Sequence, residues 1–160
     1  MEDAWSSVPL TLPCARAILS GSGAAAPRRA RQRRTYVCPA GPGRRWPTLL
    51  SARGYATGAF VGAYVLDRRF RARPRLRAHY DDAIARRASG GSVLESERRA
   101  EAVAVRGRGV DPRAQTGRFL AWVHFYDPHA PYDPPPPWRE RVRGAALRRQ
   151  IAYADATSRA

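Results

Sequence analysis

Two apolar runs of strand length limit the folds open to this chain, because they are the stretches best able to form the interior of a sheet. The first run, YATGAFVGAYVL, extends from Tyr55 to Leu66 and follows a short helical pattern that begins at Pro47 and ends at Gly54. The second run, FLAWVHF, extends from Phe119 to Phe125 and gives way to a polar loop rich in Asp, His and Pro. A helix followed by a buried strand is a repeating unit of α/β sheets. The sequence therefore predicts an α/β fold in which helices flank the sheet.

Three further helical patterns are short. Residues 12–20 fit a helix for which Thr11 is a suitable N-cap and Gly21 a suitable C′ residue. The capping box SVLE predicts a helix over residues 92–105, which the glycines that follow would stop. A last pattern begins at Arg141 and continues to the end of the sequence.

The composition separates the structured runs from a segment that cannot contribute much to a core. The chain has 160 residues, which fits one domain spanning residues 1–160. Residues 23–45 mix Gly, Ala, Pro and Arg without apolar periodicity, and we predict a loop or disordered segment there. The net charge is +16, but every basic residue is Arg and neither Lys nor Asn occurs. This usage is typical of a GC-rich gene, so the positive charge is weak evidence for a binding surface.

The sequence disfavours a disulfide framework, a zinc site and a membrane span. Cys14 and Cys38 are too few for a framework and lack His or Cys neighbours at zinc-ligand spacing, so we predict two free thiols. The first residues lack the basic and apolar regions of a signal peptide. No apolar run reaches the roughly 20 residues needed to cross a bilayer. The sequence does not indicate a cellular compartment.

Four blocks of the sequence, taken in order, resemble the N-terminal domain of a bacterial sulfatase of the alkaline phosphatase superfamily. They are SSVPLTLPCARAILSG, LLSARGYATGAFVGAYVLDRRF, FLAWVHFYDPHAPYDPP and RRQIAYADA. The third block is the most specific, because a buried strand that ends in HFYDPHAPY combines several rare residues. The resemblance lapses in residues 23–45 and 71–77, where the sequence is typical of a GC-rich gene in another reading frame. We therefore interpret the chain as a truncated and partly diverged sulfatase fragment.

The resemblance implies hydrolysis of sulfate esters, on a small molecule or a glycan, by a hydroxyl-type nucleophile held on a divalent cation, Ca²⁺ or Mg²⁺. In this family the nucleophile is a formylglycine made from the Cys or Ser of C/S-x-P-x-R. Thr11 falls on that position, Cys14 falls on a variable one, and Ala15 stands where the family has Arg. A threonine cannot be oxidised to the aldehyde, although some relatives use an unmodified Thr. Thr11 is thus the candidate catalytic residue, with a helix N-cap as the alternative.

The loop after the second apolar run contributes the other candidate. His129 matches the family's histidine that contacts the sulfate oxygens or the leaving group, so it is the candidate substrate-binding residue, with a structural role as the alternative. His124, within the run, is predicted to be a packed core residue with one ring nitrogen satisfied. Asp127 and Asp133, each followed by proline, are predicted to form turns in which the carboxylate bonds to local backbone.

The carboxylates that hold the cation in the family are missing from the matching blocks. Neither the aspartate pair of an opening strand nor the later Asp-His or Asp-Asn pair is found. Asp81 and Asp82 follow a polar tract, and we predict a solvated acidic turn there rather than a metal site. Without a metal, an alcohol of high pKa has little means of activation. We therefore identify no metal ligands and expect no hydrolysis by this chain alone.

Two other hypotheses remain. The basic run APRRARQRR, residues 26–34, predicts nonspecific binding of nucleic acid or another polyanion, although it lacks interleaved aromatic residues and a known recognition motif. Alternatively, the chain is a non-catalytic remnant. In that case the absence of the family's first strand would leave a sheet position unpaired and favour aggregation.

Overall fold

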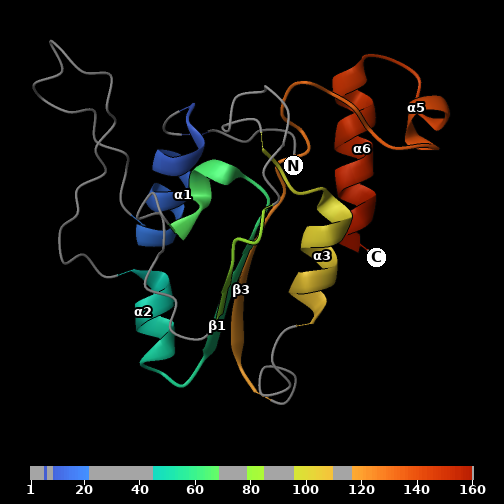
Figure 1. Ribbon diagram of the computed structural model, residues 1–160. Helices are drawn as coiled ribbons and strands as arrows, with labels where there is room; N and C mark the ends of the chain where they lie inside the picture. The colour runs from blue at the N-terminus through green and yellow to red at the C-terminus, as the bar shows by residue number, and fades with distance from the viewer. Residues whose placement is uncertain are drawn as a thin grey trace, which may run out of the picture.

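The computed structural model describes residue 6 and residues 9–21, 45–68, 79–84, 96–109 and 117–159. The predicted loop of residues 23–45 lies outside this part except for Arg45, as does the basic run of residues 26–34. The elements, in chain order (Figure 1), are α1 (Thr11–Ser20), α2 (Trp46–Ser51), β1 (Ala56–Val61), the 3-10 helix η1 (Tyr64–Leu66), β2 (His79–Asp81), α3 (Ala100–Arg108), β3 (Phe119–His124), α5 (Trp138–Arg141) and α6 (Ala146–Arg159).

The three described strands form one parallel sheet in the order β2-β1-β3. Strand β1 is central, with Ala56 opposite Phe119 at one end and Val61 opposite His124 at the other. The short strand β2 pairs with the second half of β1, where Phe60 lies opposite Asp81. Parallel strands need long crossover connections, which here include helix α3 between β2 and β3. The α/β fold predicted from the sequence is confirmed.

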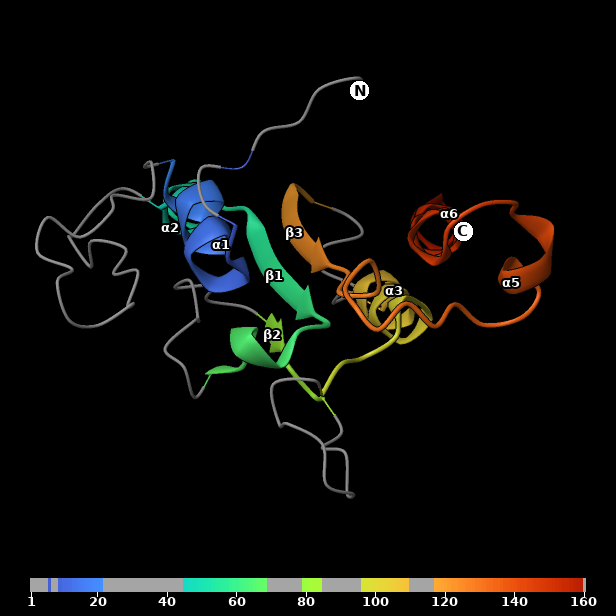
Figure 2. The ribbon, with the colours of Figure 1, turned by 90° about the horizontal axis from the view of Figure 1, so that it is seen from above.

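Helices cover both faces of the sheet. Seen from above, α1 and α2 lie on one side and α3 and α6 on the other (Figure 2). Toward α1 the side chains form a buried cluster, against which further apolar residues pack; the cluster consists of Ala15, Ala59, Val61, Ala63, Leu66 and Tyr80. Toward α3, Phe60 and Val103 are almost completely buried. Helix α6 packs against α3 through Tyr153, whose side chain has no exposed surface.

The central strand ends earlier than the apolar run predicts. Strand β1 stops at Val61, and the chain passes through Gly62 and a bridge at Ala63 into η1. Gly62 is tightly enclosed, because a Cβ there would lie 3.1 Å from the carbonyl oxygens of both Arg98 and His124. The run is apolar to its end because Tyr64 and Leu66 are buried by packing rather than by strand pairing.

Two helix predictions are wrong at their starts. Helix α3 begins at Ala100 instead of residue 92 and continues through Gly107 to Arg108. The residues before it are extended, because Glu97 bridges Ala63 and the N–H of Arg98 donates to the carbonyl of Gly62. The capping box itself, residues 92–95, lies outside the described residues. The helix predicted from Arg141 begins only at Ala146, as α6, because the short helix α5 ends at Arg141 and a bend separates the two.

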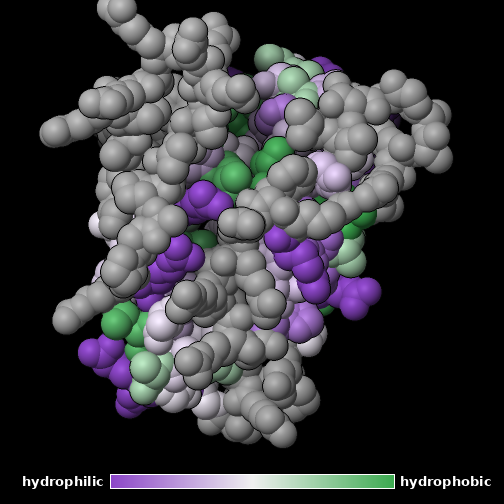
Figure 3. Space-filling view, turned by 60° about the vertical axis from the view of Figure 1, so that its left-hand side comes forward, coloured by the Kyte–Doolittle hydropathy of each residue, from purple (hydrophilic) through white to green (hydrophobic). Residues whose placement is uncertain are grey.

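The described surface is polar, with isolated apolar residues. Figure 3 shows hydrophilic groups beside small hydrophobic ones on the face that it presents. The most exposed apolar side chains near α1 and α2 are Leu10, Ile18 and Trp46, at 45%, 62% and 55%. Within the described residues, no helix is both long enough and apolar enough to span a membrane.

Candidate functional site

The two candidate residues lie on segments at one edge of the sheet. Helix α1 begins at the edge where β1 and β3 end, and the loop with His129 leaves β3 at that same edge (Figure 1). In open α/β sheets, ligands bind beyond the carboxyl ends of the strands. Tyr126 of the loop and Leu12 of α1 pack against the same buried cluster, which ties the two segments to one part of the core.

Thr11 is the first residue of α1, not its cap. The N-cap is Leu10, whose backbone is extended and which forms no side-chain cap hydrogen bond. The N-cap alternative for Thr11 is therefore wrong, whereas the prediction that Gly21 ends the helix in the left-handed region is confirmed by its φ of 65°. The Thr11 hydroxyl is half-buried and makes no hydrogen bond within the described residues. Backbone N–H groups of a first helical turn have no partner inside the helix, so they can bind an anion.

The neighbours of Thr11 explain how this turn differs from the sulfatase pattern. Ala15 is 5% exposed and belongs to the buried cluster beneath α1, so the arginine that the family has at this position would enter the core. The sulfur of Cys14 lies 3.2 Å from the hydroxyl of Ser6. Arg16, one residue later, is half-buried.

His129 is exposed but held in one orientation. Its ring stacks on Tyr126 with 4.4 Å between centroids, and its Nδ1–H donates to the carbonyl of Ala130 at 2.7 Å. The backbone N–H of His129 also donates to the carbonyl of Tyr126. Because Nδ1 is engaged, Nε2 is the nitrogen that remains for a bound anion or leaving group.

The other predicted residues of this loop have structural roles. Asp127 is 5% exposed, and its Oδ2 has no hydrogen-bond partner within the described residues, although the backbone N–H groups of Ala100 and of Asp127 itself act on the carboxylate and favour its charged form. Burial raises the pKa of Asp127 above its ordinary value, despite these N–H groups. Asp133 forms ion pairs with Arg139 and Arg99 rather than only a local turn.

His124 agrees with its prediction only in part, because it is packed but half-buried, and no hydrogen bond within the described residues satisfies its Nδ1. It ends β3 and makes an edge contact with Trp122, at 5.9 Å between ring centroids. Its Nδ1 is buried without a hydrogen-bond partner in the described part of the chain. Burial accordingly lowers the pKa of His124, which favours the neutral imidazole.

The prediction of a solvated acidic turn at residues 81–82 is wrong. Asp81 is the last residue of β2 and is 8% exposed, and NH1 of Arg98 donates to its Oδ1 at 2.8 Å. Asp82 is bound by Arg68 through both Nε and NH2. Burial alone would raise the pKa of each carboxyl, but the arginine and backbone N–H groups outweigh it and hold both pKa values below the ordinary range.

Arg98 is the main residue of this edge that the sequence did not reveal. Its NH2 group donates to the carbonyl of Val61 at 2.9 Å and to that of Asp81 at 3.3 Å. The guanidinium thus joins the carboxyl ends of β1 and β2 and fills the space between them. In the sequence, Arg98 lies in an ordinary charged run, ESERR, with nothing to mark it.

The divalent cation implied by the resemblance does not fit the described residues. No group of three His, Cys, Asp or Glu side chains among them is arranged to hold a metal ion. Two carboxylates at the sheet edge already have partners, since Asp81 binds Arg98 and Asp82 binds Arg68. Hard cations such as Ca²⁺ and Mg²⁺ require several oxygen ligands.

No family model matches the chain, and comparison with curated proteins and with solved structures gives no match either. The likeness to sulfatases therefore depends on the four sequence blocks. The structure adds the parallel α/β sheet, with the segments of Thr11 and His129 at its carboxyl edge.

Proposed function

We propose that this chain is a diverged part of a sulfatase-type hydrolase of the alkaline phosphatase superfamily, and that it binds sulfate esters without hydrolysing them by itself. The observation that supports this proposal is that the start of α1 and the loop after β3 lie at the carboxyl edge of one parallel sheet. The resemblance assigns the nucleophile position to Thr11 and the substrate contact to His129. The esters that the resemblance implies are those of small molecules or glycans.

In this proposal the chain contributes hydrogen-bond donors to the ester. The first-turn N–H groups of α1 would donate to oxygens of the sulfate group, and Nε2 of His129 would donate as well when both ring nitrogens carry a proton, since Nδ1–H already donates to Ala130. The Thr11 hydroxyl would lie beside the sulfur, but as a neutral alcohol it is a weak nucleophile. Ca²⁺ or Mg²⁺ would supply its activation in the family, and we found no described ligand set for such an ion.

Binding of p-nitrophenyl sulfate, followed by NMR titration of the full chain, tests the proposal. We expect saturable shifts in the NMR signals of Thr11 and His129. The His129→Gln variant should bind at least about threefold more weakly, because it loses a hydrogen-bond donor that can carry a positive charge. His79→Gln is the matched control, since exposed His79 begins β2 opposite Gly58, in the middle of β1 and away from the carboxyl ends of the strands. Equal losses in both variants, or no binding, would contradict the proposal. Release of p-nitrophenol with added Ca²⁺ or Mg²⁺ would show that metal ligands were missed.

A second candidate function is nonspecific polyanion binding. It is favoured by the net charge of +16 and by the exposed residues Arg141, Arg143 and Arg148, which form no ion pair within the described residues. Filter binding of DNA duplexes should then show an affinity that falls steeply with salt and does not depend on sequence. A clear sequence preference would point instead to a specific nucleic-acid-binding role.

A further inference from the structure

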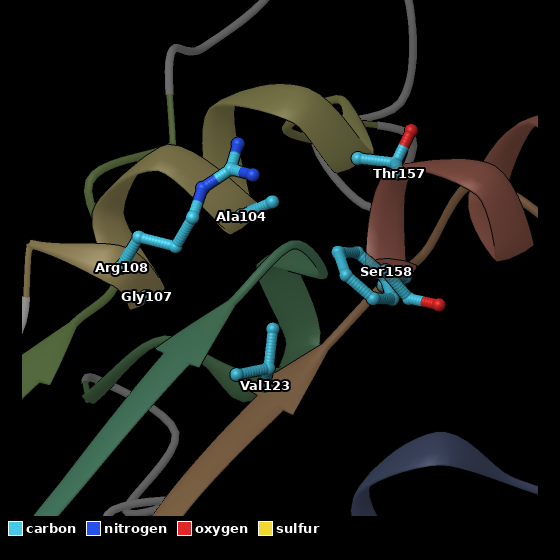
Figure 4. Close-up of a pocket in the computed structure, with 7 residues that line it drawn as sticks. Ala104, Gly107, Arg108, Val123, Thr157 and Ser158 are labelled. Atoms are coloured by element: carbon cyan, nitrogen blue, oxygen red, sulfur yellow. The ribbon is translucent and has the colours of Figure 1, made fainter. Parts of the chain in front are cut away.

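A cavity of about 260 Å³ lies between α3, α6 and β3, apart from the candidate ester site. Its apolar lining comes from Ala104 and Gly107 of α3 and from Val123 and Phe125 at the end of β3. Its polar lining is Arg108, Thr157 and Ser158. Figure 4 shows Val123 on the strand side, with α3 on one flank and the end of α6 on the other.

The cavity exists because only one of the two helices on this face of the sheet packs closely on the strands. Helix α3 contacts β1 and β3, whereas α6 packs on α3 and α5. Gly107 brings α3 close to the sheet, since a Cβ there would lie 3.4 Å from Val123. The side chain of Val123 nevertheless stays 37% exposed, although it points to the helix-covered face. An apolar group that entered the cavity would remove this surface from water.

The polar groups of the lining favour a negatively charged ligand. The hydroxyls of Thr157 and Ser158 already donate to the carbonyls of Tyr153 and Asp155. Arg108 forms no ion pair within the described residues, and no lining residue is acidic. In Figure 4 its side chain runs along α3, and the guanidinium lies near Ala104 on the side of the helix that faces Thr157. The cavity therefore combines an apolar floor with one unpaired cation.

We propose that this cavity binds a small amphiphilic anion, with its hydrocarbon part on Val123 and Phe125 and its anionic head on Arg108. Small-molecule sites are typically apolar clefts with a few polar groups that fix orientation, and the volume of this cavity, about 260 Å³, is just below their usual range of roughly 300–1,000 Å³, which suits a small ligand. The occupant is a medium-chain carboxylate or alkyl sulfate. Arg108 also lies in the last turn of α3, where a cation stabilises the helix, so the test must separate binding from stability.

Isothermal titration with octanoate, octyl sulfate and octanol tests this inference on the full chain. We expect both anions to bind about tenfold more tightly than octanol, since a charge-assisted hydrogen bond adds roughly that factor. The two anions are compared in the His129→Gln variant, in which binding at the candidate ester site is weakened, and the tighter of the two there identifies the head group. Arg108→Gln should remove this advantage and leave octanol binding unchanged, a difference that a loss of helix stability would not produce.

Two further variants complete the test. Arg148→Gln removes the same charge from an exposed position on α6 and should leave all three affinities unchanged. Ser158→Phe, at an exposed residue of the cavity rim, should block the opening and abolish binding of all three ligands. The inference is overturned if no ligand binds, if octanol binds as tightly as the anions, or if Arg148→Gln acts like Arg108→Gln. Octyl sulfate is itself a sulfate ester and would also bind the candidate ester site, so the deciding comparison is octanoate against octanol, whose outcome does not depend on the ester proposal because that site shares no lining residue with this cavity.

Discussion

Replacing Arg98 with methionine is expected to lower the free energy of unfolding by about 3 kcal/mol. The Arg98 and Asp81 side chains are only 9% and 8% exposed, and the guanidinium donates to a carboxylate oxygen and to two strand-end carbonyls. Methionine has a similar length but no donor, so Asp81 would become a buried charge with poor compensation. This estimate is at the lower end of the roughly 3–5 kcal/mol typical of broken buried pairs.

The lower end is chosen because Asp81 keeps two other partners. The backbone N–H of Ala83 donates to its Oδ1 at 3.1 Å, and Nε of Arg106 lies 3.8 Å from its Oδ2. The Arg106 side chain is 68% exposed, so solvent screens its contribution. Adding Asp81→Asn to Arg98→Met removes the buried charge and should restore about 2 kcal/mol of the loss.

The effect of Arg98→Met should also depend on pH. In the unchanged protein the pKa of Asp81 lies below its ordinary value, so its contribution to stability is present above the unfolded pKa and is lost as pH falls through the folded pKa. Without Arg98, burial is opposed less and the pKa rises. The difference in stability between the two proteins should therefore shrink as pH falls from about 5 to about 3.

Urea unfolding followed by tryptophan fluorescence, at several pH values, measures these changes. The control is Arg159→Met, which removes an exposed ion pair with Asp155 and should cost less than about 0.5 kcal/mol. The reasoning is refuted if Arg98→Met costs no more than this control. It is also refuted if Asp81→Asn restores nothing, or if the loss does not change with pH.

Three further predictions concern the same edge of the sheet and the helices behind it. Gly62→Ala should destabilise the protein by about 1–3 kcal/mol, because its Cβ would press on backbone atoms; Gly58→Ala, with only ordinary contacts, should change stability little in the same urea experiment. The stability of Asp127→Asn relative to the unchanged protein should increase as pH rises above about 4, because burial raises the pKa of Asp127 and its ionisation opposes folding. A stability difference between the two proteins that does not change with pH would argue against this. Tyr153→Ala should lower the free energy of unfolding by about 3–5 kcal/mol, because Tyr153 is fully buried. Tyr153→Phe should lower it by under about 1 kcal/mol, because the Tyr153 hydroxyl accepts a long hydrogen bond of 3.5 Å from the N–H of Glu101; similar thermal shifts for both variants would contradict this.

The elements that the sequence predicts well are those whose burial follows from local pattern. Strand β3 and helix α1 agree with the predicted ranges to within a residue at each end. Pro47 lies in the first turn of α2, as expected, and Gly21 ends α1 with a positive φ. In these cases the apolar run or the terminal residue itself carries the information.

The elements that the sequence pattern does not predict depend on partners far away in the chain. Strand β2 has only three residues, HYD, in an arginine-rich tract, and is a strand because it pairs with Gly58, Ala59 and Phe60 of β1. The late start of α3 has a similar origin, since Glu97 and Arg98 bond to the turn after β1 rather than continuing a helix. No local periodicity marks such pairing, because its energy comes from residues far away in the sequence.

For the candidate site, the sequence identified the residue types but not the groups that bind the carboxylates. Thr11 and His129 remain predictions of function, supported by their common edge of the sheet. The buried Asp81 carboxylate at that edge is held by Arg98, so it cannot turn toward a cation without breaking this ion pair. Asp127 differs, because its buried Oδ2 has no hydrogen-bond partner within the described residues. The contacts that stabilise the sheet edge therefore keep Asp81 from serving as a metal ligand, which agrees with the proposal that the chain does not hydrolyse esters. A variant that frees Asp81 would lose stability before it gained a ligand for a metal.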